Sequence, residues 1–142
     1  MLSIGKLARA AGAKVPTIRY YEQIGLLEPP ARTEGNQRLY EPGAADRLAF
    51  IRHARDLGFP LEAIRDLLSL SDRPDQSCEA ADAIARAQLA EVERRLARLS
   101  ALKAELERMV DQCQGGRIAN CRVIESLGDH SLCQVEHAPA EA

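Results

Sequence analysis

The sequence contains, at residues 16–25, the stretch Pro16-Thr17-Ile18-Arg19-Tyr20-Tyr21-Glu22-Gln23-Ile24-Gly25. Proline is favoured at the first position of a helix and glycine just beyond its end, so this stretch predicts one short helix. Its buried face is predicted by the helical spacing of Ile18, Tyr21 and Ile24. The other faces carry side chains that can reach a partner: Thr17, Arg19 and Tyr20.

The residues on either side predict a small winged unit. Ser3 is a suitable N-cap for a helix over residues 4–10 that ends at Ala11-Gly12, and two short helices around a tight turn form a helix-turn-helix. Pro29-Pro30 then interrupts the chain. Glu34-Gly35-Asn36 predicts a turn between two short extended arms, so residues 32–38 are expected to form a β-hairpin wing.

Basic residues in this part of the chain indicate contact with DNA. Lys14, Arg19 and Tyr20 lie on or beside the second helix, and an arginine stands at each base of the wing, at Arg32 and Arg38. A helix in the major groove with arginines on phosphates is a common arrangement. Residues 1–60 hold nine Lys and Arg against six Asp and Glu, whereas residues 61–142 hold 10 against 15. The front half is therefore the one expected to meet a polyanion.

Two further helices complete the predicted N-terminal domain, residues 1–70. Pro42 opens the first, which ends at Gly58, and its expected core face is Ala45, Leu48, Ala49, Ile51 and Leu57. Pro60 opens the second, whose expected buried residues are Leu61, Ile64, Leu67 and Leu68. The polar residues 71–77 are read as a linker.

Residues 78–112 contain no Gly or Pro and predict one long helix. Its apolar stripe repeats every three or four residues and comprises Leu89, Val92, Leu96, Leu99, Leu102, Leu106 and Met109. A lone helix would leave this stripe in water, so we expect it to pair with a second copy as an antiparallel coiled coil. The chain is then a homodimer of all-α fold.

Three cysteines bracket this helix and indicate a metal site. Cys78 precedes the helix, whereas Cys113 and Cys121 follow it in a loop that contains Gly115-Gly116. A helix rises about 1.5 Å per residue, so Cys78 is expected on the order of 50 Å from the loop of its own chain. It can reach a loop only in an antiparallel partner, and three thiolates suit a soft metal ion. A thiol redox switch and inert structural cysteines are the alternatives.

Residues 113–127 are expected to form the metal-binding loop and one short helix, with a mobile tail at 128–142. The tail carries His130, Cys133 and His137, which could be ancillary ligands or plain surface residues.

The sequence lacks the features of membrane proteins, secreted proteins and common enzymes. No apolar run approaches a membrane span, and the N-terminus lacks the features of a signal peptide, so a cytoplasmic location is expected. Motifs for phosphate-binding loops, zinc proteases and serine hydrolases are absent, so an enzyme is not expected.

These residues resemble the MerR family of bacterial transcription regulators from about residue 4 to residue 127. The similarity rests on Ile4-Gly5-Lys6-Leu7-Ala8, Thr17-Ile18-Arg19-Tyr20-Tyr21-Glu22, Gly25-Leu26-Leu27, the wing with Gly35-Asn36-Gln37-Arg38-Leu39-Tyr40, and Leu48-Ala49-Phe50-Ile51-Arg52. The resemblance implies a winged helix-turn-helix dimer that binds double-stranded promoter DNA between two elements with an overlong spacer. It also implies that the ligand makes the dimer bend and untwist the DNA, so that RNA polymerase can use both elements.

Within the family, the second half is similar to the sensors of cadmium, lead, zinc or mercury. Cys113 and Cys121 match the paired loop cysteines, and Cys78 matches the position where divalent sensors carry Cys and Cu(I) or Ag(I) sensors carry Ser. The resemblance thus implies a soft divalent ion (Cd, Pb, Zn or Hg) as the effector, with a Cu(I)-responsive or redox-responsive regulator of the same fold as the alternative. Lys14, Thr17, Arg19 and Tyr20 are then the expected DNA-contacting residues of the helix, together with Arg32 and Arg38 of the wing. A coiled-coil adaptor without specific DNA binding is the remaining alternative.

Overall fold

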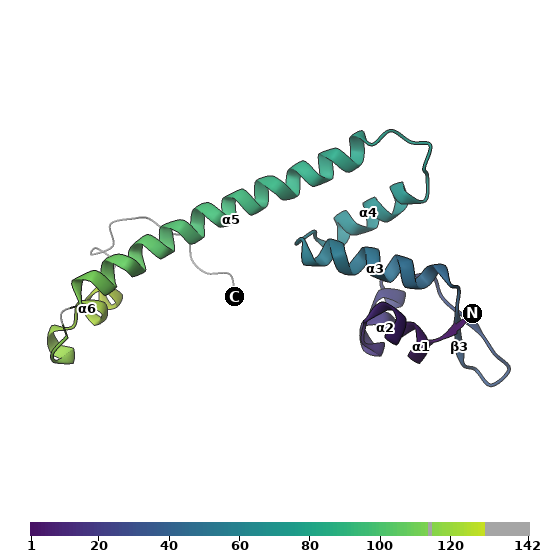
Figure 1. Ribbon diagram of the computed structural model, residues 1–142, viewed down its shortest axis with the longest axis horizontal. Helices are drawn as coiled ribbons and strands as arrows, with labels where there is room; N and C mark the ends of the chain where they lie inside the picture. The colour runs from purple at the N-terminus through teal and green to yellow at the C-terminus, as the bar shows by residue number, and fades with distance from the viewer. Residues whose placement is uncertain (114, 130–142) are drawn as a thin grey trace. The chain divides into compact units, whose positions relative to one another are not determined.

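The computed structural model describes residues 1–113 and 115–129, and it divides the chain into two compact units that meet between Ala85 and Arg86. Helices dominate, as Figure 1 shows. The elements in chain order are β1 (Leu2–Ser3), α1 (Ile4–Ala11), α2 (Val15–Gln23), β2 (Ala31–Arg32), β3 (Arg38–Tyr40), α3 (Gly43–Asp56), α4 (Leu61–Ser71), α5 (Glu79–Gln112), the 3-10 helix η1 (Ile118–Asn120) and α6 (Arg122–Gly128).

The first two helices form the predicted helix-turn-helix. The Ser3 hydroxyl caps α1 by accepting the Lys6 N–H at 3.3 Å. Gly12 ends α1 with a φ of 64°, and a Cβ there would lie 2.5 Å from a guanidinium nitrogen of Arg52. The left-handed backbone therefore favours glycine at this position, and any other residue would also require the Arg52 side chain to shift. Pro16 lies in the first turn of α2, which starts at Val15, one residue before the predicted start.

Two neighbouring groups of buried side chains hold the N-terminal unit together. The first joins α1, α2 and β3 to α3 and consists of Leu7, Ile18, Leu27, Tyr40 and Leu48. The second joins α3 to α4 and consists of Leu26, Ile51, Ala54, Ile64 and Leu68. Leu26 and Leu27 enter different groups because the chain turns after Gly25, whose φ is 81°. The consecutive leucines thus tie the helix-turn-helix to the rest of the unit.

The wing is confirmed, and the structure adds one strand that the sequence did not predict. β2 pairs antiparallel with β3, with Arg32 opposite Arg38, and Asn36 adopts a φ of 62° in the turn. β1 pairs with the other side of β3, with Leu2 opposite Tyr40, which gives a three-stranded sheet of order β1-β3-β2. The fold is thus mostly helical, as predicted, and β1 extends the predicted hairpin to a small sheet, because the backbone of residues 2–3 pairs with β3 before α1 begins.

The predicted core face of α3 is correct at Leu48 and Ile51 but wrong at Leu57, which is 65% exposed. The helix ends at Asp56 and Gly58 takes a φ of 86°, so the chain turns there and Phe59 packs against the second buried group instead. The prediction missed Ala54. This residue is buried because it lies three residues after Ile51, on the same face of the helix.

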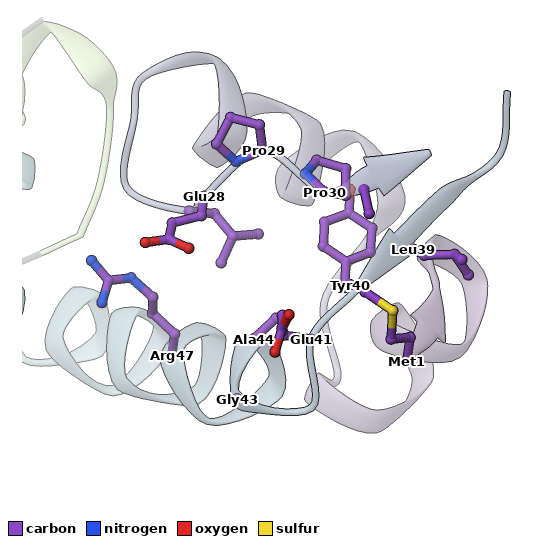
Figure 2. Close-up of a pocket in the computed structure, with 12 residues that line it drawn as sticks. Met1, Glu28, Pro29, Pro30, Leu39, Tyr40, Glu41, Gly43, Ala44 and Arg47 are labelled. Carbon is purple, nitrogen blue, oxygen red and sulfur yellow. The ribbon is translucent and has the colours of Figure 1, made fainter. Parts of the chain in front are cut away.

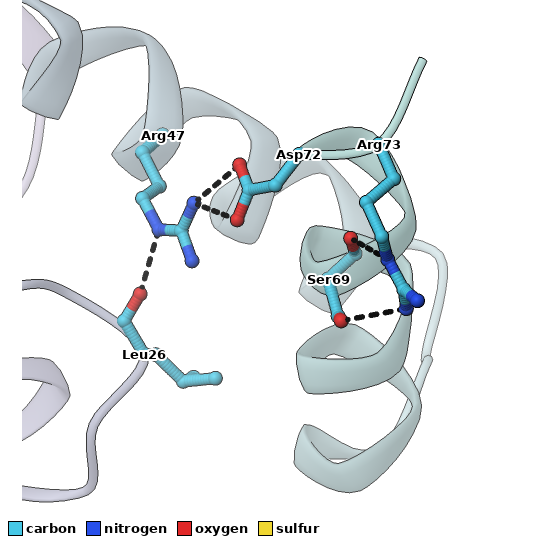
Figure 3. Close-up of polar contacts among 5 residues, drawn as sticks. All are labelled: Leu26, Arg47, Ser69, Asp72 and Arg73. Atoms are coloured by element: carbon cyan, nitrogen blue, oxygen red, sulfur yellow. Dashed lines mark hydrogen bonds and ion pairs between the residues drawn. The ribbon is translucent and has the colours of Figure 1, made fainter. Parts of the chain in front are cut away.

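One arginine joins the end of the helix-turn-helix to the end of α4. Arg47 of α3 donates from Nε to the Leu26 carbonyl oxygen at 2.9 Å, and its Nη1 lies 3.3 Å from the Asp72 carboxylate (Figure 3). Asp72 is the residue that ends α4, and Arg73 beside it donates to the Ser69 carbonyl and hydroxyl oxygens. These contacts fix the side chains of Asp72 and Arg73 at the C-terminal end of α4, before the segment that leads to α5.

In the second unit, α6 lies beside the C-terminal end of α5 (Figure 1). Arg122 Nε of α6 donates to Gln112 Oε1 of α5 at 2.9 Å. Met109 and Glu105 on α5 and Ser126 on α6 are each less than 10% exposed. The predicted short helix that folds back on the long one is thus present. In the described part of the chain, no helix is both long enough and apolar enough to span a bilayer.

Candidate metal site and DNA interface

The three predicted metal ligands lie in two places in the chain. Cys78 is exposed at the residue before α5, where its carbonyl oxygen accepts the Asp82 N–H. The neighbouring Ser77 hydroxyl accepts the Glu79 N–H at 3.3 Å, so this side chain takes part in the start of the helix. Cys113 is exposed just after α5, and Cys121 is half-buried just before α6.

The structure brings Cys113 and Cys121 together. The pKa of the Cys121 thiol is lowered by hydrogen bonds from the backbone N–H groups of Ile124 and Val123 and by one from the Cys113 thiol, with partial burial and Glu125 acting in the opposite direction. A lowered pKa favours the thiolate, which is the form that binds metal ions. The loop therefore presents two adjacent thiols, and the lowered pKa of Cys121 favours its thiolate form.

The backbone of the loop requires its glycines. Gly115 and Gly116 have φ values of 77° and 91°, which other residues rarely adopt. The hydrogen bond between Arg122 and Gln112 closes the base of the loop, because these residues directly adjoin Cys121 and Cys113. Gln112 Oε1 also accepts Arg108 Nη1 at 3.1 Å. Gln112 therefore joins α5 to the first residue of α6, next to both cysteines in the sequence.

Within a single chain, residues 1–113 and 115–129 contain no three His, Cys, Asp or Glu side chains placed to hold a metal ion together. The loop supplies two soft sulfur donors, which fit a thiophilic ion but leave a three-coordinate site one ligand short. The suggested ancillary ligands His130, Cys133 and His137 fall outside the described residues, as does most of the predicted tail.

Three of the predicted DNA-contacting residues line one cavity of about 290 Å³. Arg19 comes from α2, Arg32 from β2 and Arg38 from β3, and the remaining lining residues are Ser3, Ile4, Asn36 and Gln37. Guanidinium groups bind phosphate oxygens in a planar, two-pronged geometry. The cavity between the helix and the wing is thus chemically suited to a polyanion.

The two wing arginines also have partners inside the protein. Arg32 Nη1 donates to the Asn36 carbonyl oxygen at 3.0 Å, which supports the wing turn. Arg38 Nε lies 3.5 Å from a carboxylate oxygen of Glu22 on α2. Each arginine thus has an internal contact that sets its position as well as a place at the cavity.

The other predicted contacts lie on α2 outside this cavity. Lys14 is the exposed N-cap residue, and Thr17 is half-buried in the first turn. Tyr20 is 47% exposed, and its ring lies 5.8 Å from that of Tyr21, centroid to centroid. Thus Lys14 and Tyr20 are open to solvent on the helix that the sequence predicts for recognition.

Glu22 is the residue near this site to which the sequence assigned no role. Its Oε2 accepts the Tyr40 hydroxyl at 2.5 Å and faces Arg38, so it joins α2 to β3. The available signal was the spacing of Arg38 and Tyr40, since residues two apart on a strand share a face. That spacing shows which side chains lie together but does not name the helix residue that meets them.

A second cavity, of about 490 Å³, lies between the Pro29-Pro30 segment and the start of α3 (Figure 2). The Tyr40 ring and the Arg47 side chain are among its lining groups. None of the predicted DNA or metal residues lines it, so it is separate from the cavity that holds Arg19 and the wing arginines.

Comparison with known families agrees with the winged helix-turn-helix unit and the long helix that follows it. A model described as "MerR HTH family regulatory protein" matches residues 2–71, and one described as "MerR, DNA binding" matches residues 45–109. The chain is 43% identical over 130 residues to the HTH-type transcriptional regulator ZntR of Escherichia coli K12, covering 89% of this chain and 92% of that protein. This chain belongs to the MerR family.

Two further MerR relatives indicate the branch. The heavy metal-dependent transcription regulator 2 of Rhizobium meliloti is 35% identical over 92% of this chain and 88% of its own length. The crystal structure of the regulator PbrR691 from Ralstonia metallidurans CH34 with lead(II) is 40% identical, with a TM-score of 0.79 over 89% of this chain and 99% of that one. The chain is thus a transcription regulator of the MerR family that is similar to heavy-metal-responsive members, and the expectation that it is not an enzyme is confirmed by these relatives.

Proposed function

We propose that the protein is a homodimeric promoter switch that responds to a soft divalent ion, one of Cd, Pb, Zn or Hg. The observation that carries the proposal is the contact between Cys113 and Cys121, together with the missing third ligand in the described part of the chain. Cys78 of a second copy would complete a site of three thiolates. The lead(II) complex of the related PbrR691 supports an ion of this class.

The second copy is supported by the exposed apolar stripe of α5. Leu89, Leu96, Leu99 and Leu106 are each between 58% and 61% exposed in the single chain. Leaving such side chains in water forgoes on the order of 1.5–3 kcal/mol for each one that could be fully buried. An antiparallel partner helix would cover the stripe and bring Cys78 of one chain towards the loop of the other.

In the proposed switch, the metal-free dimer occupies the promoter without activating it. Ion binding at the two loops changes the relation of the two winged units, so that the DNA is bent and untwisted for RNA polymerase. Footprinting the promoters in the neighbourhood of its own gene, with and without Cd²⁺, tests this. We expect the same protected site in both states and new hypersensitive positions at its centre with metal. The absence of any protected site would refute the proposal.

Mixed dimers test the shared site directly. In a heterodimer of Cys78→Ser and Cys113→Ser chains, one complete site remains, because the second chain supplies Cys78 and the first supplies the loop. We expect one tightly bound Cd²⁺ per heterodimer, observed by thiolate-to-metal absorption. The matched control pairs Cys113→Ser with Cys121→Ser, which leaves no complete loop and should bind none. A first heterodimer that also binds none would place all ligands in one chain.

The homodimeric variants separate the ions. Cys78→Ser should abolish the response to divalent ions and retain a two-thiolate loop suited to Cu(I) or Ag(I). Cys113→Ser and Cys121→Ser should each abolish every metal response and leave metal-free DNA binding intact. The released protons should be measurable as well, since thiols ionise when they bind a metal ion.

A thiol redox switch is the second candidate, because two adjacent thiols can also close to a disulfide. Activation of a reporter by oxidant in the presence of a metal chelator would favour it. Activation by Cd²⁺ under reducing conditions, with no response to oxidant, would favour the metal switch.

A further inference from the structure

The Glu22 carboxylate lies between the second helix of the helix-turn-helix and the wing. Its side chain is 13% exposed, although it is an acidic residue in a unit expected to face DNA. Its Oε2 accepts the Tyr40 hydroxyl at 2.5 Å and lies 3.5 Å from Arg38 Nε. A nearly buried carboxylate is costly unless it has partners, and here both partners come from the same strand, β3.

Tyr40 gives this carboxylate a fixed reference point. The Tyr40 side chain is 1% exposed and belongs to the buried group that contains Leu7 and Ile18. Its hydroxyl is therefore held by the packing of the core. Because Arg38 lies two residues earlier on the strand, it emerges on the same face as Tyr40.

Arg38 depends on Glu22 for its position more than the other arginines of the cavity do. Its Nε is buried and makes no hydrogen bond among the described residues, and the Glu22 carboxylate oxygen that forms its ion pair lies 3.5 Å away. Arg19 and Arg32 line the same cavity, and three guanidinium groups repel one another. The negative charge of Glu22 opposes that repulsion at the point where Arg38 enters the cavity.

We propose that Glu22 is a positioning residue for DNA recognition, which fixes the wing against the recognition helix and holds Arg38 at the cavity. This inference rests on the proposed function, because it takes Arg38 to be a DNA contact. Glu22 itself needs no contact with DNA. Its role is to make the arginine part of a preformed site rather than a mobile charge.

Simple electrostatics and positioning predict opposite effects for Glu22→Gln. The substitution removes one negative charge from the DNA-binding unit, which by itself tightens binding to any DNA. It also keeps an acceptor for Tyr40 but removes the ion pair with Arg38. If Glu22 positions Arg38, binding to a specific site weakens by about tenfold, whereas non-specific binding stays the same or tightens.

The experiment uses the full-length dimer and two DNA probes. The specific probe is a duplex selected by the wild-type protein from a random-sequence library, and the non-specific probe is poly(dI-dC). The variants are Glu22→Gln, Arg38→Ala, both together, and Glu28→Gln as the control. Glu28 is exposed and lies at the other cavity, so its substitution makes the same charge change without touching the wing arginine.

We expect Glu22→Gln to weaken binding to the selected duplex alone, and to cause no further weakening when Arg38 is already alanine. Glu28→Gln should leave both affinities unchanged or slightly tighter. The inference is overturned if Glu22→Gln behaves like Glu28→Gln, if its effect persists in the Arg38→Ala background, or if Arg38→Ala leaves the selected duplex tightly bound. If circular dichroism shows that Glu22→Gln does not fold, Glu22→Asp tests the inference instead. Its shorter side chain keeps the negative charge but moves it away from Arg38, so binding to the selected duplex should weaken. A wild-type protein that selects no sequence would instead refute the proposed function.

Discussion

Arg47 and Asp72 form an ion pair of 3.3 Å that joins the first half of α3 to the residue that ends α4. The same guanidinium donates to the carbonyl oxygen of Leu26, a residue that is 1% exposed just after the second helix of the helix-turn-helix. One side chain thus connects the helix-turn-helix to the residue that follows α4. The two contacts differ in environment, because the Asp72 side chain is 61% exposed whereas the hydrogen bond to the Leu26 carbonyl is partly buried. Figure 3 shows both contacts.

This difference predicts that Asp72→Asn and Arg47→Ala lower the free energy of unfolding by unequal amounts. Asp72→Asn should lower the free energy of unfolding by less than about 1 kcal/mol, since exposed ion pairs contribute little. Arg47→Ala should cost about 1.5–3 kcal/mol, because the Leu26 carbonyl loses a charged donor. Urea unfolding at a fixed protomer concentration measures both. Arg73→Ala, which removes contacts to Ser69 only, is the control, and equal losses for Arg47→Ala and Asp72→Asn would contradict this assignment.

Tyr40 predicts a loss of stability in alkaline solution. Burial, the hydrogen bond to Glu22 and the charge of Glu22 raise the pKa of the Tyr40 hydroxyl well above its ordinary value. Above pH 10 the unfolded chain releases this proton and the native chain keeps it, so stability falls as pH rises. The contribution is complete below about pH 10, and a single proton accounts for at most about 1.4 kcal/mol per pH unit.

The measurement is the free energy of unfolding of wild type and Tyr40→Phe between pH 9 and pH 11.5. The wild type should show the steeper decline above pH 10, and the curves should run parallel below it. Tyr20→Phe removes an exposed hydroxyl and serves as the control, with the same slope as wild type. Identical slopes for wild type and Tyr40→Phe would show that this hydroxyl is not held in the neutral form.

Local signals in the sequence were enough to predict most of the elements. Pro16, Gly25 and Gly58 mark helix boundaries by backbone preference alone, and the leucine repeat in 78–112 needs only helical periodicity. Strand β1 was missed because two residues carry no periodicity, and their pairing depends on where β3 lies in space. Leu57 was misplaced because its spacing fits the apolar face, while the chain turns one residue later.

The residues of the candidate site could be named from the sequence only in part. Cysteines and arginines are conspicuous by residue type, so Cys113, Cys121 and the wing arginines could be named from the sequence. Glu22 and Gln112 could not, because a carboxylate or amide on a helix is usually a solvent-exposed residue. Their roles come from tertiary contacts with residues 16 and 10 positions away, Arg38 and Arg122.

The apolar stripe of α5 predicts a dimer that one charge can disrupt. Leu96→Asp would place an unpaired carboxylate in the proposed seam, which is strongly unfavourable once water is excluded. We expect monomers by sedimentation, with loss of specific DNA binding, although no DNA-contacting residue is changed. Ala97→Asp adds the same charge to the adjacent exposed position on another face of the helix and should remain dimeric. A dimeric Leu96→Asp variant would show that the seam lies elsewhere.

The hydrogen bond between Gln112 and Arg122 predicts how the proposed metal-binding loop is ordered before an ion binds. These residues adjoin Cys113 and Cys121, so their 2.9 Å contact fixes the two ends of the loop that carry the thiols. Gln112→Ala removes the acceptor without changing the charge or any proposed ligand. The thiols then have to be ordered by the ion itself, at a cost in conformational free energy.

We expect Cd²⁺ affinity to fall by about tenfold, which corresponds to about 1.4 kcal/mol. Amide hydrogen exchange over residues 122–128 should accelerate, while the middle of α5 keeps its protection. Lys103→Ala, which breaks an exposed pair with Glu107 on the same helix, should alter neither quantity. If Gln112→Ala accelerates exchange in α6 but binds Cd²⁺ as tightly as wild type, the contact holds the helix alone and does not prepare the thiols.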